Sequence, residues 1–297
     1  MDRIGLKKIV IAGGSGFVGR ALTKHFSAFY HVIVLSRATN WDGRTLGAWV
    51  NELDGAYALI NLTGKNVNCR YTGKNRKEIL DSRVLSTKIL GEAIRKVSDP
   101  PKVWIQMSSA TIYRHSEDKP NDETFGEIGA DFSMNVCKAW EKAFNEIQMS
   151  DIRRVIMRTS IVMGNDGGAF PPLKKLVKSG LGGKQGKGTQ MVSWIHVEDI
   201  VGVVEWMLQG SASGVYNVTA PQPVSNRIFM KQLRAAYKAW IAFPATEWML
   251  KIGARLIGTE TELVLKSRWV IPKRLIQDGY RFKFPTLESA LKELVGK

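Results

Sequence analysis

The sequence contains only two cysteines, Cys69 and Cys137, and it has no apolar run of the ~18 residues that a membrane-spanning helix needs. Two cysteines in 297 residues are too few for a disulfide scaffold, which favours a reducing compartment. The first predicted strand begins at Lys7, so the sequence leaves no room for a signal peptide. We therefore expect a cytoplasmic protein that does not bind membranes.

Acidic residues are also scarce, because 27 Asp and Glu stand against 43 Lys and Arg, which gives a formal net charge of +16. The stretch 167–193 has no carboxylate but carries five lysines, so it either faces an anionic ligand or is a solvated loop. A positive field of this size attracts anions of many kinds. No recognised nucleic-acid-binding motif occurs and the basic residues are scattered. We expect a small-molecule, anionic substrate and no nucleic acid.

Three glycines follow the first strand-like run at a spacing typical of nucleotide-binding turns. Lys7–Ala12 is short, apolar and β-branched, which suits a buried parallel strand, and Phe17–Phe26 has apolar residues at helical intervals. In the G-x-x-G-x-x-G pattern, Gly13 permits a tight turn, Gly16 admits a pyrophosphate, and Gly19 lets helix and strand pack closely. The helix start offers N–H groups to a phosphate. Such spacing also occurs in turns without a ligand. We assign to the cofactor Gly13, Gly16, Phe17, Val18 and Gly19.

The end of the second predicted strand, His31–Arg37, favours NADP over NAD. An acidic residue there would bind the 2′-hydroxyl of NAD, but the sequence has Ser36 and Arg37 and no carboxylate before Asp42. Arg37 can pair with a 2′-phosphate and stack on the adenine, or it is simply a surface residue. We predict NADP as the cofactor. Further cofactor residues are predicted at the ends of later strands, namely Leu62, Thr63, Gly64 and Ser108.

Strand patterns alternate with helical patterns over the first 220 residues, which predicts an α/β fold with a Rossmann-type doubly wound parallel sheet. Strands are expected at Lys7–Ala12, His31–Arg37, Tyr57–Thr63, Lys102–Ser109, Arg153–Met163, Val192–Ile195 and Val215–Val218. Helices are expected at Phe17–Phe26, Asn75–Val97, Asp131–Gln148 and Val197–Leu208. We expect residues 1–165, with 190–220 returning, to form the NADP-binding domain. Residues 166–189 and 221–297 would form a smaller, mostly helical C-terminal substrate lobe.

The chain resembles the extended short-chain dehydrogenase/reductase superfamily over nearly its full length. The motifs that carry this resemblance are GGSGFVG at Gly13–Gly19, INLTG at Ile60–Gly64, SSATIY at Ser108–Tyr113, SWIHVEDI at Ser193–Ile200 and GVYNV at Gly214–Val218. Within the superfamily it is similar to the atypical, epimerase/dehydratase-like branch called "epimerase family protein", which has a C-terminal domain of unknown function. Residues similar to that branch are Ser82 with Arg83, Trp140 with Glu141, Arg158 with Thr159, and Pro272-Lys273-Arg274. The resemblance implies a substrate held between an NAD(P)-binding domain and the C-terminal lobe.

The proton relay of the resembled superfamily is incomplete in this sequence. That relay uses Ser, Tyr and Lys, with Y-x-x-x-K on one helix face, so that the ammonium lowers the pKa of the phenol and the phenolate acts as general base. Ser109 matches the serine, but Ser133 and Cys137 stand at the tyrosine and lysine positions. None of the seven tyrosines has a lysine four residues later. Lys138 is one residue from Cys137, which places it about 100° around the helix.

The residues leave two functional interpretations open. In the first, the chain is an NADP(H)-dependent oxidoreductase or nucleotide-sugar epimerase-like enzyme that acts on a carbonyl or alcohol. Its rearranged acid/base set would come from Ser109, Tyr113 and Cys137, with His115 as a further candidate, although packing or surface roles also suit the last three. In the second, the chain is a non-catalytic NADP(H)-binding sensor or scaffold.

Three arginines are candidates for binding the anionic substrate, namely Arg70, Arg83 and Arg158. Each is alternatively an ordinary charge at the surface or at the edge of the core. We assign no metal-binding residues. The helices predicted at 75–97 and 131–148 are the faces on which the resembled superfamily dimerises, so the resemblance implies a homodimer.

Overall fold

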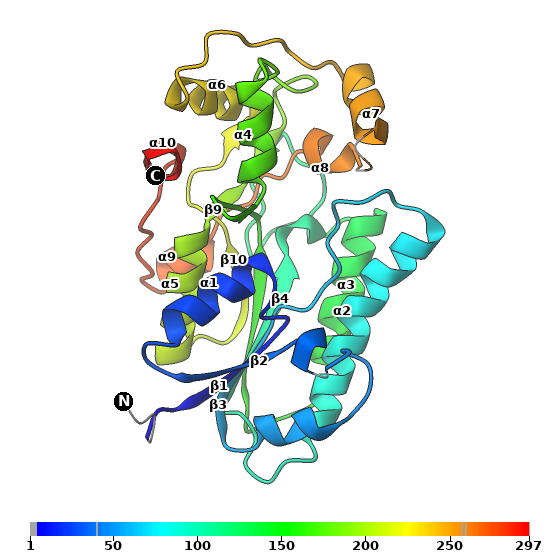
Figure 1. The fold of residues 1–297 in the computed structure, drawn as a ribbon, viewed down its shortest axis with the longest axis vertical. Coiled ribbons are helices and arrows are strands. Elements are labelled where there is room, and N and C mark those ends of the chain that lie inside the picture. The colour runs from blue at the N-terminus through cyan, green and yellow to red at the C-terminus, as the bar shows by residue number, and fades with distance from the viewer. Residues whose placement is uncertain (1–4, 40, 257, 259, 297) are drawn as a thin grey trace.

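The computed structural model describes residues 5–39, 41–256, 258 and 260–296, and it contains a six-stranded parallel sheet (Figure 1). The order of its strands is β10-β5-β4-β3-β1-β2. Their bounds are β1 Lys8–Ala12, β2 His31–Leu35, β3 Ala56–Asn61, β4 Val103–Ser109, β5 Arg153–Thr159 and β10 Gly214–Val218. The strands are mostly apolar, as expected for a sheet whose two faces are both covered by helices. The predicted doubly wound fold is confirmed.

Two pairs of helices form the outer layers (Figure 1). On one face α1 (Phe17–Phe26) packs beside α5 (Val197–Gln209), and on the other α2 (Gly73–Ile94) packs beside α3 (Phe132–Asn145). Alternate side chains of β1 serve the two layers, because Ile9 and Ile11 join the core under α1 and α5 while Val10 joins the core under α2 and α3.

The chain reverses its direction of travel across the sheet at β1. It passes from β1 to β2 on one side and then returns to place β3 on the other side of β1. Such a reversal opens a crevice beyond the carboxyl ends of the two central strands, which is where open α/β sheets bind ligands. Three short 3-10 helices lie in the connections between sheet strands. η1 Arg37–Thr39 follows β2, η2 Ala48–Leu53 precedes β3, and η3 Ala110–Ile112 follows β4.

A second group of elements lies above the carboxyl edge of the sheet (Figure 1). Its strands are β6 Ile161–Gly164, β7 Gly167–Gly168, β8 Met191–Val192, β9 Trp194–His196 and β11 Val224–Ser225. The remaining helices are α4 Phe170–Lys178, α6 Asn226–Ala236, α7 Glu247–Leu256, α8 Glu262–Leu265, α9 Lys273–Gln277 and α10 Leu287–Gly296. A separate apolar core joins α4, α6 and α10. In the described part of the chain, no helix combines the length and hydropathy needed to cross a bilayer.

Three details of the predicted secondary structure are wrong. The single strand expected at 153–163 is two strands in different sheets, because the chain leaves β10 and pairs with β9 after Ser160. Gly164, Gly167 and Gly168, where no strand was predicted, form the β6–β7 hairpin, and Gly168 takes a φ of 71° there. Strands also continue beyond Pro221, since β11 pairs with β8.

Candidate functional site

A glycine turn brings the ends of three strands together at the crevice. Gly13 has a φ of 77°, in the left-handed region that favours glycine, and its N–H donates to the carbonyl of Leu35 at the end of β2 (2.9 Å). A Cβ on Gly13 would lie 3.0 Å from the Cα of Thr63, just beyond β3. The turn therefore depends on glycine for its conformation and for the close approach of β3.

The neighbouring glycines have two different roles: one borders open space, and two allow close packing. A Cβ on Gly16 would meet only the carbonyl oxygen of Gly13, at 3.4 Å, so this position faces open space. A Cβ on Gly19 would lie 2.5 Å from the Cα of Gly14, which is incompatible with the packing of α1 on the turn. Gly14 was missed by the sequence analysis, and a Cβ there would lie 2.8 Å from Cγ1 of Val34. Gly14 and Gly19 are thus packing positions.

The first turn of α1 presents its backbone to the crevice. Gly16 is the N-cap residue and no side chain in the described part of the chain accepts from the first N–H groups, while the first turn has no acidic residue. The ring of Phe17 packs against the positions of Gly164 and Gly167, and Val18 packs against the core. These two residues can therefore offer a ligand only their N–H groups, which is the arrangement that binds phosphate at helix starts.

Ser36 and Arg37 follow β2 at the same edge of the sheet. Ser36 is mostly buried, and its N–H donates to Oγ1 of Thr39 (2.8 Å). Arg37 is exposed and, among the residues that the structure describes, its side chain has no hydrogen-bond or ionic partner. An exposed guanidinium next to the glycine turn can pair with a phosphate on the adenosine side of a dinucleotide.

The end of β3 contains a buried polar atom that has no protein partner. Oγ1 of Thr63 is buried without a hydrogen bond among the described residues, although the Thr63 N–H donates to Oδ1 of Asn61 (3.0 Å). Leu62 packs against the core, and Gly64 lies next to the guanidinium of Arg83. Buried hydroxyl groups are normally paired. The unpaired Thr63 hydroxyl and the uncapped start of α1 therefore fit a bound dinucleotide between them.

A buried chain of hydrogen bonds occupies several residues beyond β4 and β5. Oγ of Ser108 donates to Oε1 of Glu141 (2.7 Å), and Glu141 also accepts two hydrogen bonds from Arg158 (2.9 and 2.8 Å). Arg158 donates to the hydroxyl of Tyr113 (2.8 Å), which donates to Oδ1 of Asn217 (2.9 Å). Burial opposes the charge of Arg158, but Glu141 outweighs it and holds the Arg158 pKa above its usual range. Arg158 and Ser108 are therefore engaged inside the protein.

The three candidate catalytic residues lie close together around η3 but differ in accessibility. Ser109 is partly exposed, and its hydroxyl caps η3 by accepting from the N–H of Thr111 (3.2 Å). Tyr113 and Cys137 are buried in one apolar cluster with Val270, and burial raises the pKa of both, to about 12 for Cys137. Protonated, enclosed groups are poor bases and nucleophiles. This placement favours packing roles for Tyr113 and Cys137.

A tyrosine that the sequence analysis did not select lies beside Ser133. Burial raises the pKa of the Tyr71 phenol, and the neighbouring Ser133 side chain partly opposes this rise. The N–H of Tyr71 donates to Oε1 of Glu260 (2.8 Å), and Arg70 pairs with Oε2 of the same carboxylate (3.3 Å). The loop before α2 is thereby attached to the C-terminal part of the chain. No sequence spacing signals this, because the two segments are 189 residues apart.

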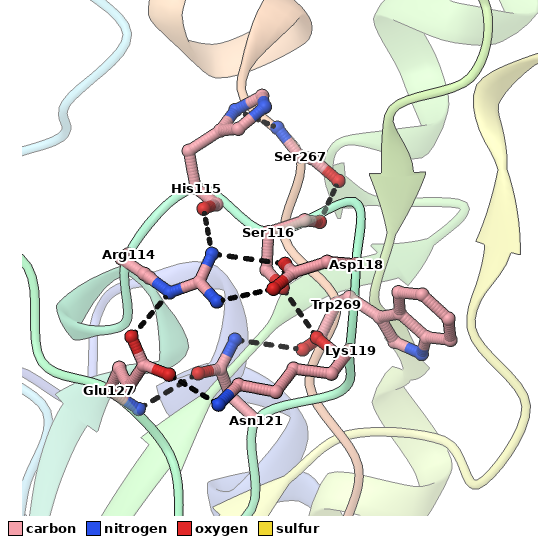
Figure 2. A network of polar contacts seen from close by, with 9 residues as sticks. All are labelled: Arg114, His115, Ser116, Asp118, Lys119, Asn121, Glu127, Ser267 and Trp269. Atoms are coloured by element: carbon pink, nitrogen blue, oxygen red, sulfur yellow. Dashed lines mark hydrogen bonds and ion pairs between the residues drawn. The ribbon is translucent and has the colours of Figure 1, made fainter.

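A polar network attaches the loop after η3 to the segment Ser267–Trp269 (Figure 2). Arg114 pairs with Asp118 and Glu127 (2.8 and 2.7 Å), which closes the loop on itself. Nδ1 of His115 accepts from the N–H of Ser267 (3.0 Å), and the N–H of Asn121 donates to the carbonyl of Trp269 (2.8 Å). His115 is thus used to position the C-terminal segment.

The same segment is held from its other side by β8 and the residue after it. The N–H of Arg268 donates to the carbonyl of Met191 (2.8 Å), and the N–H of Ser193 donates to the carbonyl of Arg268 (3.0 Å). The Ser193 hydroxyl donates to the carbonyl of Arg268 as well (2.7 Å). Backbone pairing on both sides fixes the position of Arg268. The sequence analysis missed this residue.

A groove of about 1240 Å³ lies between α1 and α5 and is lined by residues such as Lys24, Glu205 and Tyr280. His196, at its edge, is 1% exposed and uses both ring nitrogens, since Nδ1 accepts from the Glu198 N–H and Nε2 contacts Glu293 (3.0 Å). Burial lowers the His196 pKa, which favours the neutral ring. Phe17 is one of the residues that line this groove, but the other predicted site residues are not among them.

Comparison with known proteins places this geometry in a family. The model of the "NAD dependent epimerase/dehydratase family" matches residues 9–219, and a "Domain of unknown function (DUF1731)" matches residues 245–294. Human epimerase family protein SDR39U1 is 32% identical over 97% of this chain and 99% of its own length. Epimerase family protein YfhF of Bacillus subtilis is 33% identical over 97% of each chain.

A solved structure shows the same architecture. The crystal structure of human epimerase family protein SDR39U1 (isoform 2) with NADPH has a TM-score of 0.86 and 30% identity, over 97% of this chain and 99% of that one. The match covers the sheet and the C-terminal elements together. The chain therefore belongs to the NAD dependent epimerase/dehydratase family, as the resemblance of its motifs predicted.

Proposed function

We propose that the chain binds NADP(H) in the crevice between the glycine turn and β3 and uses it in an oxidoreductase or nucleotide-sugar epimerase-like reaction. The observation that carries this proposal is the uncapped start of α1, where Gly16 leaves open space, next to the end of β3 with its unpaired Thr63 hydroxyl. The human relative of similar fold, solved with NADPH, supports it.

The cofactor contacts are assigned to the residues at the carboxyl ends of the strands. The N–H groups at Gly16, Phe17 and Val18 hold the diphosphate, because Gly16 leaves room and the helix dipole favours negative charge there. Arg37 pairs with the 2′-phosphate, while Thr63 and Gly64 lie against the nicotinamide ribose. When bound, NADPH supplies a hydride.

Ser109 is the residue proposed to hold the substrate oxygen. Ser109 is partly exposed and its hydroxyl donates only a long hydrogen bond, to the carbonyl of Thr159 (3.5 Å), whereas the hydroxyl of Ser108 is committed to Glu141 and that of Tyr113 to Asn217. A hydroxyl that donates to a carbonyl oxygen orients it and stabilises developing negative charge. The substrate is a carbonyl or alcohol compound with an anionic group, for which the crevice offers arginines.

A specific observation favours the second candidate function, a non-catalytic NADP(H)-binding sensor or scaffold. Cys137 and Tyr113 are enclosed and protonated, so the standard relay has no direct replacement on α3. A protein that keeps its cofactor crevice without an acid/base pair could respond to the NADPH level by changing conformation.

The coenzyme preference is tested with Arg37→Asp. We expect the variant to bind NADPH at least about ten-fold more weakly than the wild type while NADH binding changes little, since one charge-assisted phosphate contact is lost. Arg95→Asp, an exposed position at the end of α2, is the charge-matched control. Fluorescence titration of both coenzymes measures the effect. Equal affinities of the wild type for NADPH and NADH would contradict the NADP assignment.

Turnover separates the enzyme from the sensor. Purified protein is given NADPH and a panel of carbonyl compounds with carboxylate or phosphate groups, and loss of NADPH absorbance is followed. Ser109→Ala should lower kcat about 100-fold or more with little change in melting temperature or NADPH affinity. Unchanged turnover in the variant would remove Ser109 from the site. NADPH binding without turnover on any compound of the panel would favour the sensor.

We further propose a cytoplasmic homodimer that associates through α2 and α3 and binds no nucleic acid. Both cysteines are free thiols, which is consistent with a reducing compartment. The division into an NADP-binding domain and a C-terminal substrate lobe also remains a proposal, and limited proteolysis with and without NADPH would test it.

A further inference from the structure

One end of the molecule is rich in cations. Figure 1 shows α4, α6 and the connection from α6 to α7 at this end, beyond the carboxyl edge of the sheet. The segments 167–193 and 219–246, which contain these elements, have no Asp or Glu. None of their basic residues is assigned to the cofactor. Most of these basic side chains are exposed, and the full set is Lys174, Lys175, Lys178, Lys184, Lys187, Arg227, Lys231, Arg234 and Lys238.

Contacts between residues far apart in the sequence join the two segments into one surface. The N–H of Phe243 donates to the carbonyl of Gly180 (2.9 Å), which holds the connection after α6 against the loop after α4. Nζ of Lys174 and Nζ of Lys178 each lie 5.9 Å from the ring centre of Tyr237, the residue that ends α6. We call this surface, formed by residues 174–184 and 237–243, the lysine-rich face.

Large apolar side chains are exposed within the lysine-rich face. Trp240 is 97% exposed, Phe243 63%, Ile241 60% and Leu181 43%. They come from both segments and lie close together, since a Cβ on Gly180 would lie 3.1 Å from Cγ2 of Ile241. Proteins rarely expose neighbouring apolar groups of this size unless another surface covers them. The face therefore has the composition of a contact surface.

The charge and the side-chain types of the face select among partners. Two carboxylates of neighbouring elements lie beyond its edge, since Cγ of Glu247 would lie 3.6 Å from a Cβ on Gly186, and Glu117 accepts from Oγ1 of Thr189 (3.3 Å). The face itself is positive, so the same face of a second copy would repel it. Aliphatic side chains give nucleic-acid bases no stacking surface. An anionic lipid surface matches both the charge and the apolar groups.

We propose that the lysine-rich face binds the surface of an anionic phospholipid membrane. Trp240, Ile241 and Phe243 enter the boundary between headgroups and acyl chains, where indole and phenyl rings are favoured. The lysines extend their ammonium groups to the lipid phosphates and carboxylates. Binding at a surface needs no spanning helix, so this proposal departs from the expectation, drawn from the missing apolar run, that the protein does not bind membranes. It does not depend on the proposed function.

The test is flotation of the full-length protein with vesicles of phosphatidylcholine that contain about 30% phosphatidylserine, or none. We expect the wild type to bind the anionic vesicles at least about ten-fold more strongly than the neutral ones. Trp240→Ser and Phe243→Ser should each weaken this binding about ten-fold, whereas Phe29→Ser, an exposed phenylalanine between α1 and β2, should not change it.

Charge is tested separately from apolar contact. Lys175→Gln and Lys178→Gln should each weaken binding to the anionic vesicles about five-fold, because each removes one attraction to anionic lipid. Lys96→Gln, an exposed position after α2, is the matched control and should bind normally. The substituted side chains are exposed, so each variant should keep the melting temperature of the wild type.

Fluorescence shows whether the indole enters the lipid. Vesicles with brominated acyl chains should quench the wild type, and Trp240→Phe should remove most of that quenching while it still binds. Equal binding to neutral and anionic vesicles, or binding that Trp240→Ser and Phe243→Ser leave unchanged, would overturn the inference. Tighter binding to a single-stranded RNA oligonucleotide, lost in Trp240→Ser, would assign the face to nucleic acid instead. A dimer in sedimentation velocity that Trp240→Ser dissociates would assign it to a second copy of the chain.

Discussion

At the scale of single residues, the chemistry of this crevice depends on which polar groups have partners inside the protein. Tyr113 and Arg158 are satisfied by Asn217 and Glu141, so they stabilise the fold. Thr63, Arg37 and Arg268 each have a polar group without a protein partner in the described chain. Unpaired atoms also occur in the apolar cores, at the indole nitrogens of Trp104 and Trp194, so Thr63 and Arg37 are assigned to the ligand because they also lie at strand ends beside the glycine turn.

Cys137 gives a residue-scale prediction. Its thiol pKa is raised to about 12 by burial, so below that pH the thiol form dominates and alkylation is slow. We expect native protein at about pH 8 to be modified by iodoacetamide at Cys69, which is only half-buried, and to leave Cys137 intact. Peptide mass spectrometry measures the two sites, and denatured protein is the control. Faster reaction at Cys137 than at Cys69 in the native protein would restore its candidacy as a nucleophile.

Residue positions set by local spacing could be predicted from the sequence, whereas those set by distant contacts could not. Gly13, Thr63 and Arg37 lie at strand ends, and the ends of adjacent parallel strands meet at one edge. Tyr71 and Arg268 lie in loops that are held by distant contacts. The N–H of Tyr71 donates to Glu260, which is 189 residues later, and Ser267, next to Arg268, accepts from the N–H of Met191, which is 76 residues earlier. Periodicity contains no information about such pairings.

At the scale of elements, the glycine turn and α1 act as one unit, in which the same residue type has opposite roles. The missing side chain of Gly16 leaves space for the ligand. The missing side chain of Gly19 lets the backbone of Gly14 pack directly against α1. The spacing predicted the unit because strand, turn and helix are contiguous in the chain. The division between β5 and β6 was not predicted, although the polar residues Arg158, Thr159 and Ser160 interrupt the apolar run there, because such an interruption does not by itself reveal a change of pairing partner.

Gly16→Val is therefore expected to affect mainly NADPH binding, and Gly19→Val mainly the stability of the fold. Gly16→Val should abolish NADPH binding and cost only about 1 kcal/mol of stability, because its side chain enters open space at a helix N-cap. Gly19→Val should destabilise the protein by about 1–3 kcal/mol, since its Cβ would overlap the backbone of Gly14. Urea unfolding and NADPH fluorescence titration measure the two effects. Normal NADPH binding by a folded Gly16→Val variant would refute the assignment of the diphosphate site.

At the scale of the whole molecule, the net charge of +16 creates a field that attracts nucleotides before they reach the crevice. Screening by salt weakens such a field beyond a Debye length of about 10 Å at 0.1 M. NADPH carries one more phosphate than NADH and should respond more strongly to salt.

We expect an increase in NaCl from about 20 mM to about 500 mM to weaken NADPH binding several-fold and NADH binding less. Stopped-flow measurements should show most of the loss in the association rate, because long-range attraction acts before contact. Potassium phosphate is avoided as the salt, because phosphate competes directly. An association rate that does not change with ionic strength would show that the overall charge has no part in capturing the coenzyme.

The segment around Ser267–Trp269 lies between the loop after η3 and β8, so residues near position 115 meet partners about 150 positions later in the chain (Figure 2). During synthesis, the loop after η3 cannot form these contacts until the ribosome has made almost the entire polypeptide. Long-range closure of this kind slows folding. The earlier-made sheet consequently passes through a stage in which its ligand-binding edge is uncovered, and that stage is where chaperones would engage the nascent protein.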